Sequence, residues 1–256
     1  MLMFASQSNI SGNTLKHDSL RKIIESEDSP DSLIFEAYHR LSWELKSSEP
    51  TQALEYANDA LKIAEKLNRP AKIAYALSYI GVIYWQMGNF SMALDYHLEA
   101  NSIYEDIQDH KGIARSNTNL GIIFSSQSHY DRALENYFKA LKIYEEIDDK
   151  QGMAAVLNNI GRVYSHQRDY DIAERYHLES LDLKQSENDE KGMAFSFNSL
   201  AQVYQGKNEL EKAREFYYKA LEIRRKLSDK REIASTSGNL GYLYYLLKDH
   251  DEEEKY

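Results

Sequence analysis

The feature that most constrains this chain is a period of 40 residues that runs through most of its length. Sets of residues recur at this step, and each set keeps one residue type or one size. Such fixed register is typical of repeat proteins, in which every unit is one supersecondary element that packs on its neighbours. The sets are Ala74, Ala114, Ala154, Ala194 and Ala234; Gly81, Gly121, Gly161, Ala201 and Gly241; Asp109, Asp149, Asp189 and Asp229; and Ala53, Ala93, Ala133, Ala173 and Ala213.

Within one period the spacing of apolar residues predicts two helices. Ala154, Leu157 and Ile160 fall on one side of a helix, the polar segment SHQRDYD follows, and a second helix carries Ala173. The recurring Asp precedes each first helix, where a carboxylate can cap free backbone N–H groups and face the positive end of the helix dipole. With 20 Tyr and only 3 Pro in 256 residues, the composition also favours long helices with aromatic packing. Each unit is therefore predicted to be a helical hairpin.

Glycine in the middle of the first helix needs a reason, because it costs about 1 kcal/mol relative to alanine. We expect close approach to be that reason: without a side chain at Gly161, the second helix with Ala173 can pack against the backbone. Ala201 keeps the same column small in another unit. The column is thus interpreted as a steric requirement.

The segment NLGIIFSSQSHYDRALENYFKALKIY (119–144) resembles the tetratricopeptide repeat, in the order of its small residue, aromatic residue, alanine, tyrosine and alanine. The chain is similar to a 40-residue variant of that repeat, and the resemblance covers about residues 31–256. It implies an all-α fold, a right-handed superhelical solenoid of antiparallel helix pairs. The two-lysine clamp that some members use for a C-terminal carboxylate is not reproduced.

The period divides the chain into a leader and six repeats. The repeat at 31–70 is atypical, with Ser42 in the glycine column, and is predicted to cap the array; the one at 231–256 is truncated in its second helix. The truncation suggests either a fragment of something longer or an end that packs on another chain. The predicted parts are 1–16, a disordered N-terminus or signal remnant; 17–30, a leading helix and turn; and the repeats 31–70, 71–110, 111–150, 151–190, 191–230 and 231–256.

The start of the chain leaves the compartment open. MLMFASQ (1–7) is similar to the end of a secretory signal, which would make the protein extracytoplasmic, in the periplasm; a plain N-terminus would make it cytoplasmic. Together with the repeats that follow, this arrangement resembles the N-terminal sensory region of bacterial signalling proteins such as sensor histidine kinases.

Charge and missing motifs argue against several function classes. The net charge of −10 disfavours nucleic acid as a partner, and no apolar run is long enough for a membrane span. Without cysteine there is no thiolate metal site or thiol nucleophile, and no phosphate-binding glycine loop or metallohydrolase motif occurs. Paired carboxylates such as Asp148 and Asp149 sit at helix ends, where capping is their usual role. We therefore predict no catalysis, no cofactor and no metal site.

Histidine and tyrosine recur at positions that indicate packing. His97 and His177 occupy equivalent columns and are expected to replace an aromatic ring, with the polar edge hydrogen-bonded. One aromatic residue per unit, at the column of Tyr84, Phe124, Tyr164, Tyr204 and Tyr244, is predicted to lie in the core.

A polar arc lies beside the apolar side of each first helix, and in stacked hairpins first helices line the concave surface. Asparagine offers both a donor and an acceptor, so a ladder of asparagines can bind the backbone of an extended peptide, as the resemblance implies; arginine can hold a carboxylate. The alternative is that these asparagines are solvated or bond between neighbouring helices. The candidate groove residues are Arg115, Asn119, Asn158, Asn159, Arg162, Asn198, Gln202, Asn239 and Tyr242.

The predicted function is that of a non-catalytic scaffold that binds a peptide or protein segment in its groove, as the sensory or regulatory region of a bacterial signal-transduction protein. One alternative is a free-standing adaptor that self-associates as a homodimer through the truncated repeat and its segment GYLYYLL (241–247). A second is a cytoplasmic receptor for a peptide signal. An enzyme would require a reaction that uses none of the usual constellations.

Overall fold

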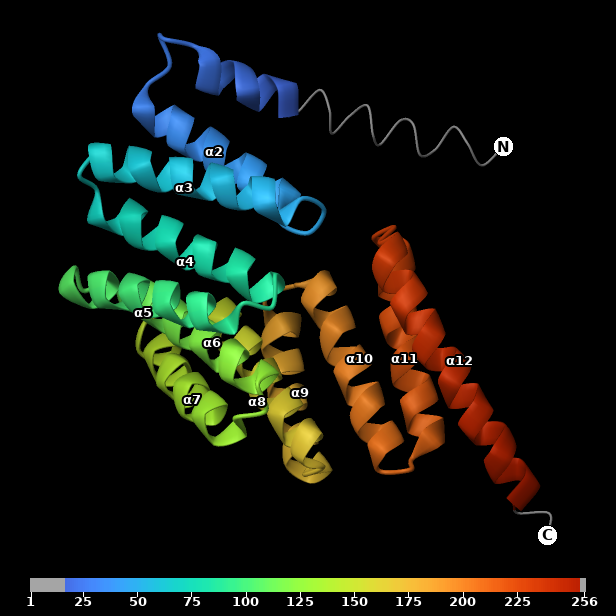
Figure 1. The fold of residues 1–256 in the computed structure, drawn as a ribbon. Coiled ribbons are helices and arrows are strands. Elements are labelled where there is room, and N and C mark those ends of the chain that lie inside the picture. Colours follow the sequence, from blue (N-terminus) through green and yellow to red (C-terminus); the bar gives the residue numbers. More distant parts are fainter. Residues whose placement is uncertain (1–16, 254–256) are drawn as a thin grey trace, which may run out of the picture. The chain divides into compact units, whose positions relative to one another are not determined.

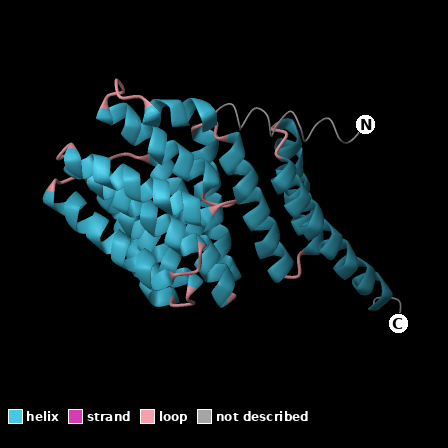
Figure 2. Cartoon of the chain, turned by 45° about the horizontal axis from the view of Figure 1, so that its top comes forward, coloured by secondary structure: helices cyan, strands magenta, loops and turns pink. Residues whose placement is uncertain are grey.

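The computed structural model of the protein describes residues 17–253, and the side chains of residues 17–248. The predictions made for residues 1–16 lie outside this part. The chain forms two compact units, with the boundary between Ile123 and Phe124, and each is described by itself. Within the described residues all regular structure is helical and no strand occurs (Figure 2).

The N-terminal unit (described residues 17–123) begins with a short helix at 17–25, in agreement with the predicted leading helix. Helices then follow as hairpins, with α2 against α3, α3 against α4 and α4 against α5 (Figure 1). The helices are α2 (Asp31–Leu45), α3 (Pro50–Lys66), α4 (Pro70–Gln86), α5 (Phe90–Asp106) and α6 (His110–Ser126), which crosses the boundary.

The C-terminal unit (described residues 124–253) repeats this pattern, and each of its helices from α7 onward packs on the next. First helices start at Lys150, Glu190 and Lys230, which keeps the 40-residue step of the sequence. The helices are α7 (Tyr130–Glu146), α8 (Lys150–Gln167), α9 (Tyr170–Ser186), α10 (Glu190–Gly206), α11 (Leu210–Lys226) and α12 (Lys230–Glu253). The predicted fold class, an all-α array of antiparallel helix pairs, is confirmed.

Each first helix from α6 onward begins directly after the aspartate that recurs in the sequence. Asp109, Asp149 and Asp189 each accept a hydrogen bond through Oδ1 from the backbone N–H three residues later, at 2.9 Å. Asp229 does the same at 3.2 Å. The predicted caps are therefore confirmed, and they satisfy one of the free donors that every helix start leaves.

Helices end in left-handed turns that recur every 20 residues. At Asn188, for example, φ is 55°, and the next N–H, of Asp189, donates to the carbonyl of Lys184 at 2.9 Å. This hydrogen bond closes the last turn of the helix, and glycine is the residue that adopts such a φ most readily. Only one of these positions is glycine. They are Asn68, Gly88, Gln108, Ser128, Asp148, Arg168, Asn188, Asn208 and Ser228.

Buried alanines and stacked aromatic rings form the core of the hairpins α8–α9 and α10–α11. Ala173 is fully buried, and the rings of Tyr164 and Tyr176 stack with centroids 5.7 Å apart. Tyr204 stacks on Phe216 in the next hairpin, at 5.2 Å. The predicted aromatic core is confirmed at Tyr204, which is 7% exposed, whereas Tyr164 is half-buried and Tyr244 on α12 is 45% exposed.

The structure corrects the explanation of the glycine column. A Cβ atom at Gly161 would lie 2.8–2.9 Å from three ring atoms of His177, and the expected neighbour Ala173 is not among the nearest groups. Gly81 faces the ring of His97 in the same way, at 2.9 Å. Tight space was thus predicted correctly, but a histidine ring fills it, because an imidazole of the second helix reaches the backbone that alanine cannot.

The truncated repeat consists of one long helix in the described residues. Helix α12 continues without a break from Lys230 to Glu253, past the position where α10 ends at Gly206 one period earlier.

Candidate functional site

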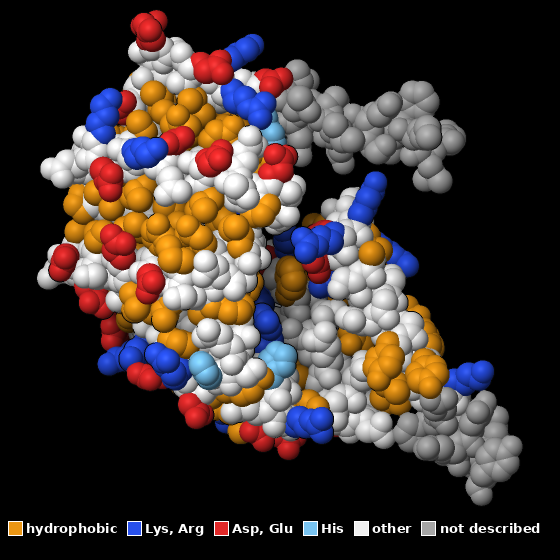
Figure 3. All heavy atoms as spheres, in the orientation of Figure 1, with side chains coloured by type: hydrophobic (Ala, Val, Ile, Leu, Met, Phe, Trp, Pro, Cys, Tyr) orange, Lys and Arg blue, Asp and Glu red, His pale blue; other side chains and the backbone are white. Residues whose placement is uncertain are grey.

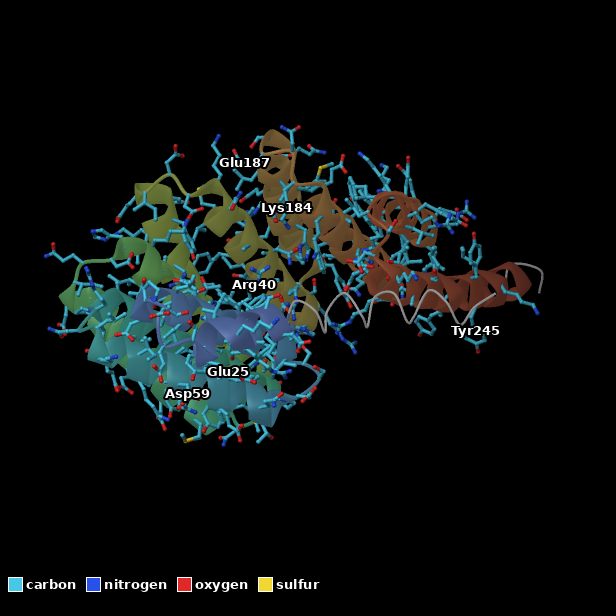
Figure 4. All side chains as sticks on the ribbon, turned by 90° about the horizontal axis from the view of Figure 1, so that it is seen from above. Glu25, Arg40, Asp59, Lys184, Glu187 and Tyr245 are labelled. Atoms are coloured by element: carbon cyan, nitrogen blue, oxygen red, sulfur yellow. The ribbon has the colours of Figure 1, made fainter. Side chains whose placement is uncertain are left out.

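Helix α8 borders a cavity in the C-terminal unit. The cavity has a volume of about 450 Å³ and lies among α8, α9 and α10. Lys184 and Glu187 lie one turn apart at the end of α9 (Figure 4). The lining residues are Lys150, Gln151, Ala154, Ala155, Asn158, Asn159, Leu183, Lys184, Glu187, Asp189, Gly192 and Phe195.

Asn158 has a structural task in this site. Its Oδ1 lies 3.1 Å from Nδ1 of His177, and because an amide oxygen only accepts, the ring donates this hydrogen bond. His177 is 1% exposed, and burial, helped by the charges of Lys184 and Arg162, lowers its pKa to about 3. The ring is therefore neutral at physiological pH. Asn158 fixes the tautomer of the ring and holds it against Gly161, while the amide N–H groups of Asn158 form no hydrogen bond with residues 17–248.

Asn159, the next residue, is half-buried and lines the same cavity. No residue of the described part of the chain forms a hydrogen bond with its side chain. A half-buried amide with both donor and acceptor unused is costly unless water or a ligand satisfies it. Arg162 is exposed one turn further along α8, outside the cavity lining, and forms no ion pair with residues 17–248.

Other asparagines of the predicted ladder bond between helices. Asn239 Nδ2 on α12 donates to Asn198 Oδ1 on α10 at 3.3 Å. Arg224 of α11 lies 3.4 Å from the same oxygen. These contacts agree with the alternative given in the sequence analysis, in which the asparagines bond between neighbouring helices. Gln202 is exposed, and Tyr242 is 56% exposed on α12.

The two candidates in the N-terminal unit are also engaged with neighbouring side chains. Arg115 Nη2 donates to the hydroxyl of Tyr104 at 2.7 Å, and its guanidinium lies over the ring of Tyr75 at 5.1 Å. Asn119 Nδ2 contacts the hydroxyl of Ser78 at 3.5 Å. Two of the nine predicted groove residues, Asn158 and Asn159, thus lie together in the cavity among α8, α9 and α10.

Comparison with known proteins identifies the architecture. The sequence model described as Tetratricopeptide repeat matches residues 72–146, 137–186, 152–226 and 192–256. The chain belongs to the tetratricopeptide repeat family. No curated protein sequence matches it.

Three solved structures illustrate the similarity in fold. A Rap protein complexed with competence and sporulation factor has a TM-score of 0.76 and 18% identity, over 91% of this chain and 69% of that chain. The Rap conjugation regulator of plasmid pLS20 in complex with the Phr* peptide gives 0.71 and 18%, over 80% and 57%. A signal-transduction ATPase (STAND) with a tetratricopeptide repeat sensor from Pyrococcus horikoshii gives 0.69 and 21%, over 85% and 33%. At these identities the similarity shows the fold alone.

Some lining residues of this tetratricopeptide repeat protein escaped the sequence analysis. Lys184 is the chief one: it is 8% exposed, and its Nζ donates to Ser196 Oγ at 2.9 Å. A signal was present, because the equivalent positions one and two periods earlier are Tyr144 and Tyr104, both buried. A lysine in a column of buried aromatic residues indicates a charge in an unusual place.

The described residues contain neither a metal-binding arrangement of side chains nor a helix that could span a membrane. No group of three His, Asp or Glu side chains in residues 17–248 has an arrangement that could hold a metal ion. Between residues 17 and 253, no helix combines the length and the apolar character that crossing a membrane requires.

Proposed function

We propose that this tetratricopeptide repeat protein is a non-catalytic binding module that holds an extended peptide or protein segment against α8 and α10. The observation that carries the proposal is the side chain of Asn159, which faces the cavity with its hydrogen-bonding groups unused by residues 17–248. An amide of this kind can donate to a peptide carbonyl and accept from a peptide N–H, whatever the peptide sequence.

The surroundings of Asn159 suit a peptide. Phe195 on α10 is 42% exposed and lines the cavity opposite the amides, where it can cover an apolar side chain of the ligand. Arg162 adds an exposed cation beyond the cavity on α8. The Rap proteins of similar fold, solved with a peptide or a factor, support the same class of ligand.

We further propose that the module is the sensory or regulatory region of a bacterial signal-transduction protein. The similar fold of an ATPase with a tetratricopeptide repeat sensor supports this role. In this proposal Asn158, Asn159 and Arg162 form the ligand-binding part of the ladder, whereas Asn198 and Asn239 mainly tie α10 to α12.

A selection from a random peptide library displayed on phage tests the proposal. A selected peptide is titrated calorimetrically into the wild type, Asn159→Ala and the control Asn136→Ala; Asn136 is equally half-buried but bonds to the carbonyl of Arg132 on α7. We expect roughly tenfold weaker binding for Asn159→Ala, about 1.4 kcal/mol, and native affinity for the control. Equal affinity of all three, or a library without binders, would contradict peptide binding here.

Exposed tyrosines on α12 favour a second candidate function, self-association. Tyr242 and Tyr245 are 56% and 61% exposed, and Figure 4 shows Tyr245 standing out from the helix. Figure 3 shows apolar side chains gathered on the same helix surface. Such a patch marks an interaction site and supports self-association through this repeat. Light scattering on Tyr242→Ser/Tyr245→Ser should then show a lower mass than the wild type, and an unchanged mass argues against it.

A further inference from the structure

One face of α12 lacks the cover that the equivalent face has in the two preceding hairpins. Gly161 on α8 is buried against the ring of His177 on α9, and Ala201 on α10 is fully buried in the hairpin with α11. The equivalent residue of α12, Gly241, is exposed. No atom of the described residues lies within 4 Å of a Cβ at Gly241 or at Gly238. This face of α12 is called the outer face below.

Exposed residues recur along the outer face at steps of four and three, which is the spacing of a seam between two packed helices. They are Ala234, Gly238, Gly241 and Tyr245. Leu243, on the opposite side of α12, is fully buried in the core that α12 shares with α10 and α11. The outer face therefore offers recesses at its glycines and, in Tyr245, a side chain that can fill such a recess on a second copy.

The two ends of α12 carry opposite charges. Lys230 and Arg231 at its start are exposed and form no ion pair with residues 17–248, whereas Glu232 beside them is paired with Arg224 at 3.0 Å. Four of the last five helical positions, 249–253, are acidic. Acidic residues at the end of a helix and basic residues at its start are both unfavourable beside the helix dipole. Each end is better placed beside the opposite end of another α12.

We propose that the outer face of α12 binds the same face of a second copy of this chain, with the two helices antiparallel. The inference rests on the second candidate function, self-association, and adds its geometry. The two-fold axis lies between Gly241 and Tyr242, at the middle of α12. Tyr245 of each copy then faces the partner's Gly238, because both are equally far from the axis. The basic start of each helix lies beside the acidic end of the other, whereas a parallel pair would place like charges together.

Disulfide cross-linking of single-cysteine variants tests this geometry, since the chain has no cysteine of its own. In the antiparallel pair the two copies of residue 241 are neighbours, whereas the two copies of residue 234 lie about 22 Å apart along the helices. A disulfide requires Cα atoms within about 7 Å of each other. Under mild oxidation Gly241→Cys should form a covalent dimer, and Ala234→Cys, on the same face, should stay monomeric on a non-reducing gel. Equal cross-linking of both variants, or none of either, overturns the inference.

Charge reversal tests the two ends of the helix. Lys230→Glu/Arg231→Glu makes both ends of α12 acidic, and Glu252→Lys/Glu253→Lys makes both ends basic. In sedimentation equilibrium each variant alone should raise the dissociation constant of the dimer at least about tenfold. An equimolar mixture of the two should regain the dimer, because each basic end then meets an acidic one. About 0.5 M salt should weaken this selective pairing.

A control of matched charge is available on α7. Lys139→Glu/Lys142→Glu reverses two exposed lysines of the same unit and should keep the dissociation constant of the wild type. Circular dichroism at 222 nm checks that all variants are folded. An unchanged dissociation constant in both α12 variants, a loss of the same size in the control, or a mixture that stays monomeric overturns the inference.

The results also separate this inference from self-association as such. If the wild type is a dimer that Tyr242→Ser/Tyr245→Ser converts to a monomer, but both α12 charge variants keep its dissociation constant, self-association stands and the antiparallel pairing is refuted. If the wild type is monomeric up to about 100 μM, the outer face belongs to another partner and both are refuted.

Discussion

Replacing the recurring glycine of the first helix by alanine should change the stability of the protein in opposite directions in two repeats. Gly161 and Gly241 are equivalent helical positions, two periods apart. A Cβ at Gly161 would lie 2.8–2.9 Å from the ring of His177, which is closer than real Cβ atoms come, whereas nothing lies within 4 Å of a Cβ at Gly241. The pair Gly161→Ala and Gly241→Ala therefore separates helix propensity from steric fit.

The expected magnitudes follow from two opposing effects. Alanine stabilises a helix interior by about 1 kcal/mol relative to glycine, at both positions. At Gly161 the ring of His177 has to move, and overpacking of this kind costs about 1–3 kcal/mol. The ring is 1% exposed and held by Asn158, so we take the middle of this range. Gly161→Ala should then lower the free energy of unfolding by about 1 kcal/mol, and Gly241→Ala should raise it by up to about 1 kcal/mol.

Thermal and urea unfolding followed by circular dichroism at 222 nm measures both changes, which correspond to about 2–4 °C in Tm per kcal/mol. A double-mutant cycle with His177→Ala provides the decisive comparison, because without the ring Gly161→Ala should become stabilising. The same sign for both glycine substitutions in the wild-type background, or a coupling with His177 below about 0.5 kcal/mol, would refute the steric explanation.

Further predictions concern pH and the helix ends. Burial lowers the pKa of His177 to about 3 from 6.5, so the unfolded chain binds more protons below pH 6.5. The contribution of His177 to the free energy of unfolding should therefore fall by about 1.5 kcal/mol between pH 6.5 and about pH 5, and urea titrations at both pH values should show a loss smaller by this amount for His177→Phe. Arg168→Gly should raise the free energy of unfolding by about 1 kcal/mol, since φ there is 66°, and the reciprocal Gly88→Ala, at φ 76°, should lower it by a similar amount in the same assay. Asp149→Ala should cost about 1 kcal/mol by removing the cap on the Gly152 N–H, whereas Asp149→Asn should keep most of it.

Much of the fold could be predicted from the sequence because each local pattern recurs in several repeats. The cap at Asp149, the buried alanine at Ala173 and the aromatic stack of Tyr164 depend on residues close in sequence or one helix away. The left-handed turns were missed, since only Gly88 among them is a glycine. Asparagine, aspartate and serine at other such positions were a weaker signal of the same conformation.

The candidate site was predictable only in part, because hydrogen-bond partners are decided by contacts between helices. From sequence, Asn158, Asn159, Asn198 and Asn239 look alike. In the structure Asn158 accepts a hydrogen bond from His177, and Asn239 donates one to Asn198. Of these four asparagines, Asn159 alone forms no side-chain hydrogen bond with residues 17–248. Lys184 was missed because helical periodicity shows where a residue lies on a helix but not whether its charge finds a partner.

The sequence by itself determined the family, the hairpin unit and where most helices begin, since these follow from short-range periodicity and caps repeated every 40 residues. Tertiary structure alone decided that a histidine ring fills the space at Gly161, that α12 continues without a break to Glu253, and that the buried Arg224 pairs with Glu232. The physical reason is that these outcomes depend on which side chains of neighbouring helices meet at 3–4 Å, a distance that local propensity and periodicity do not fix.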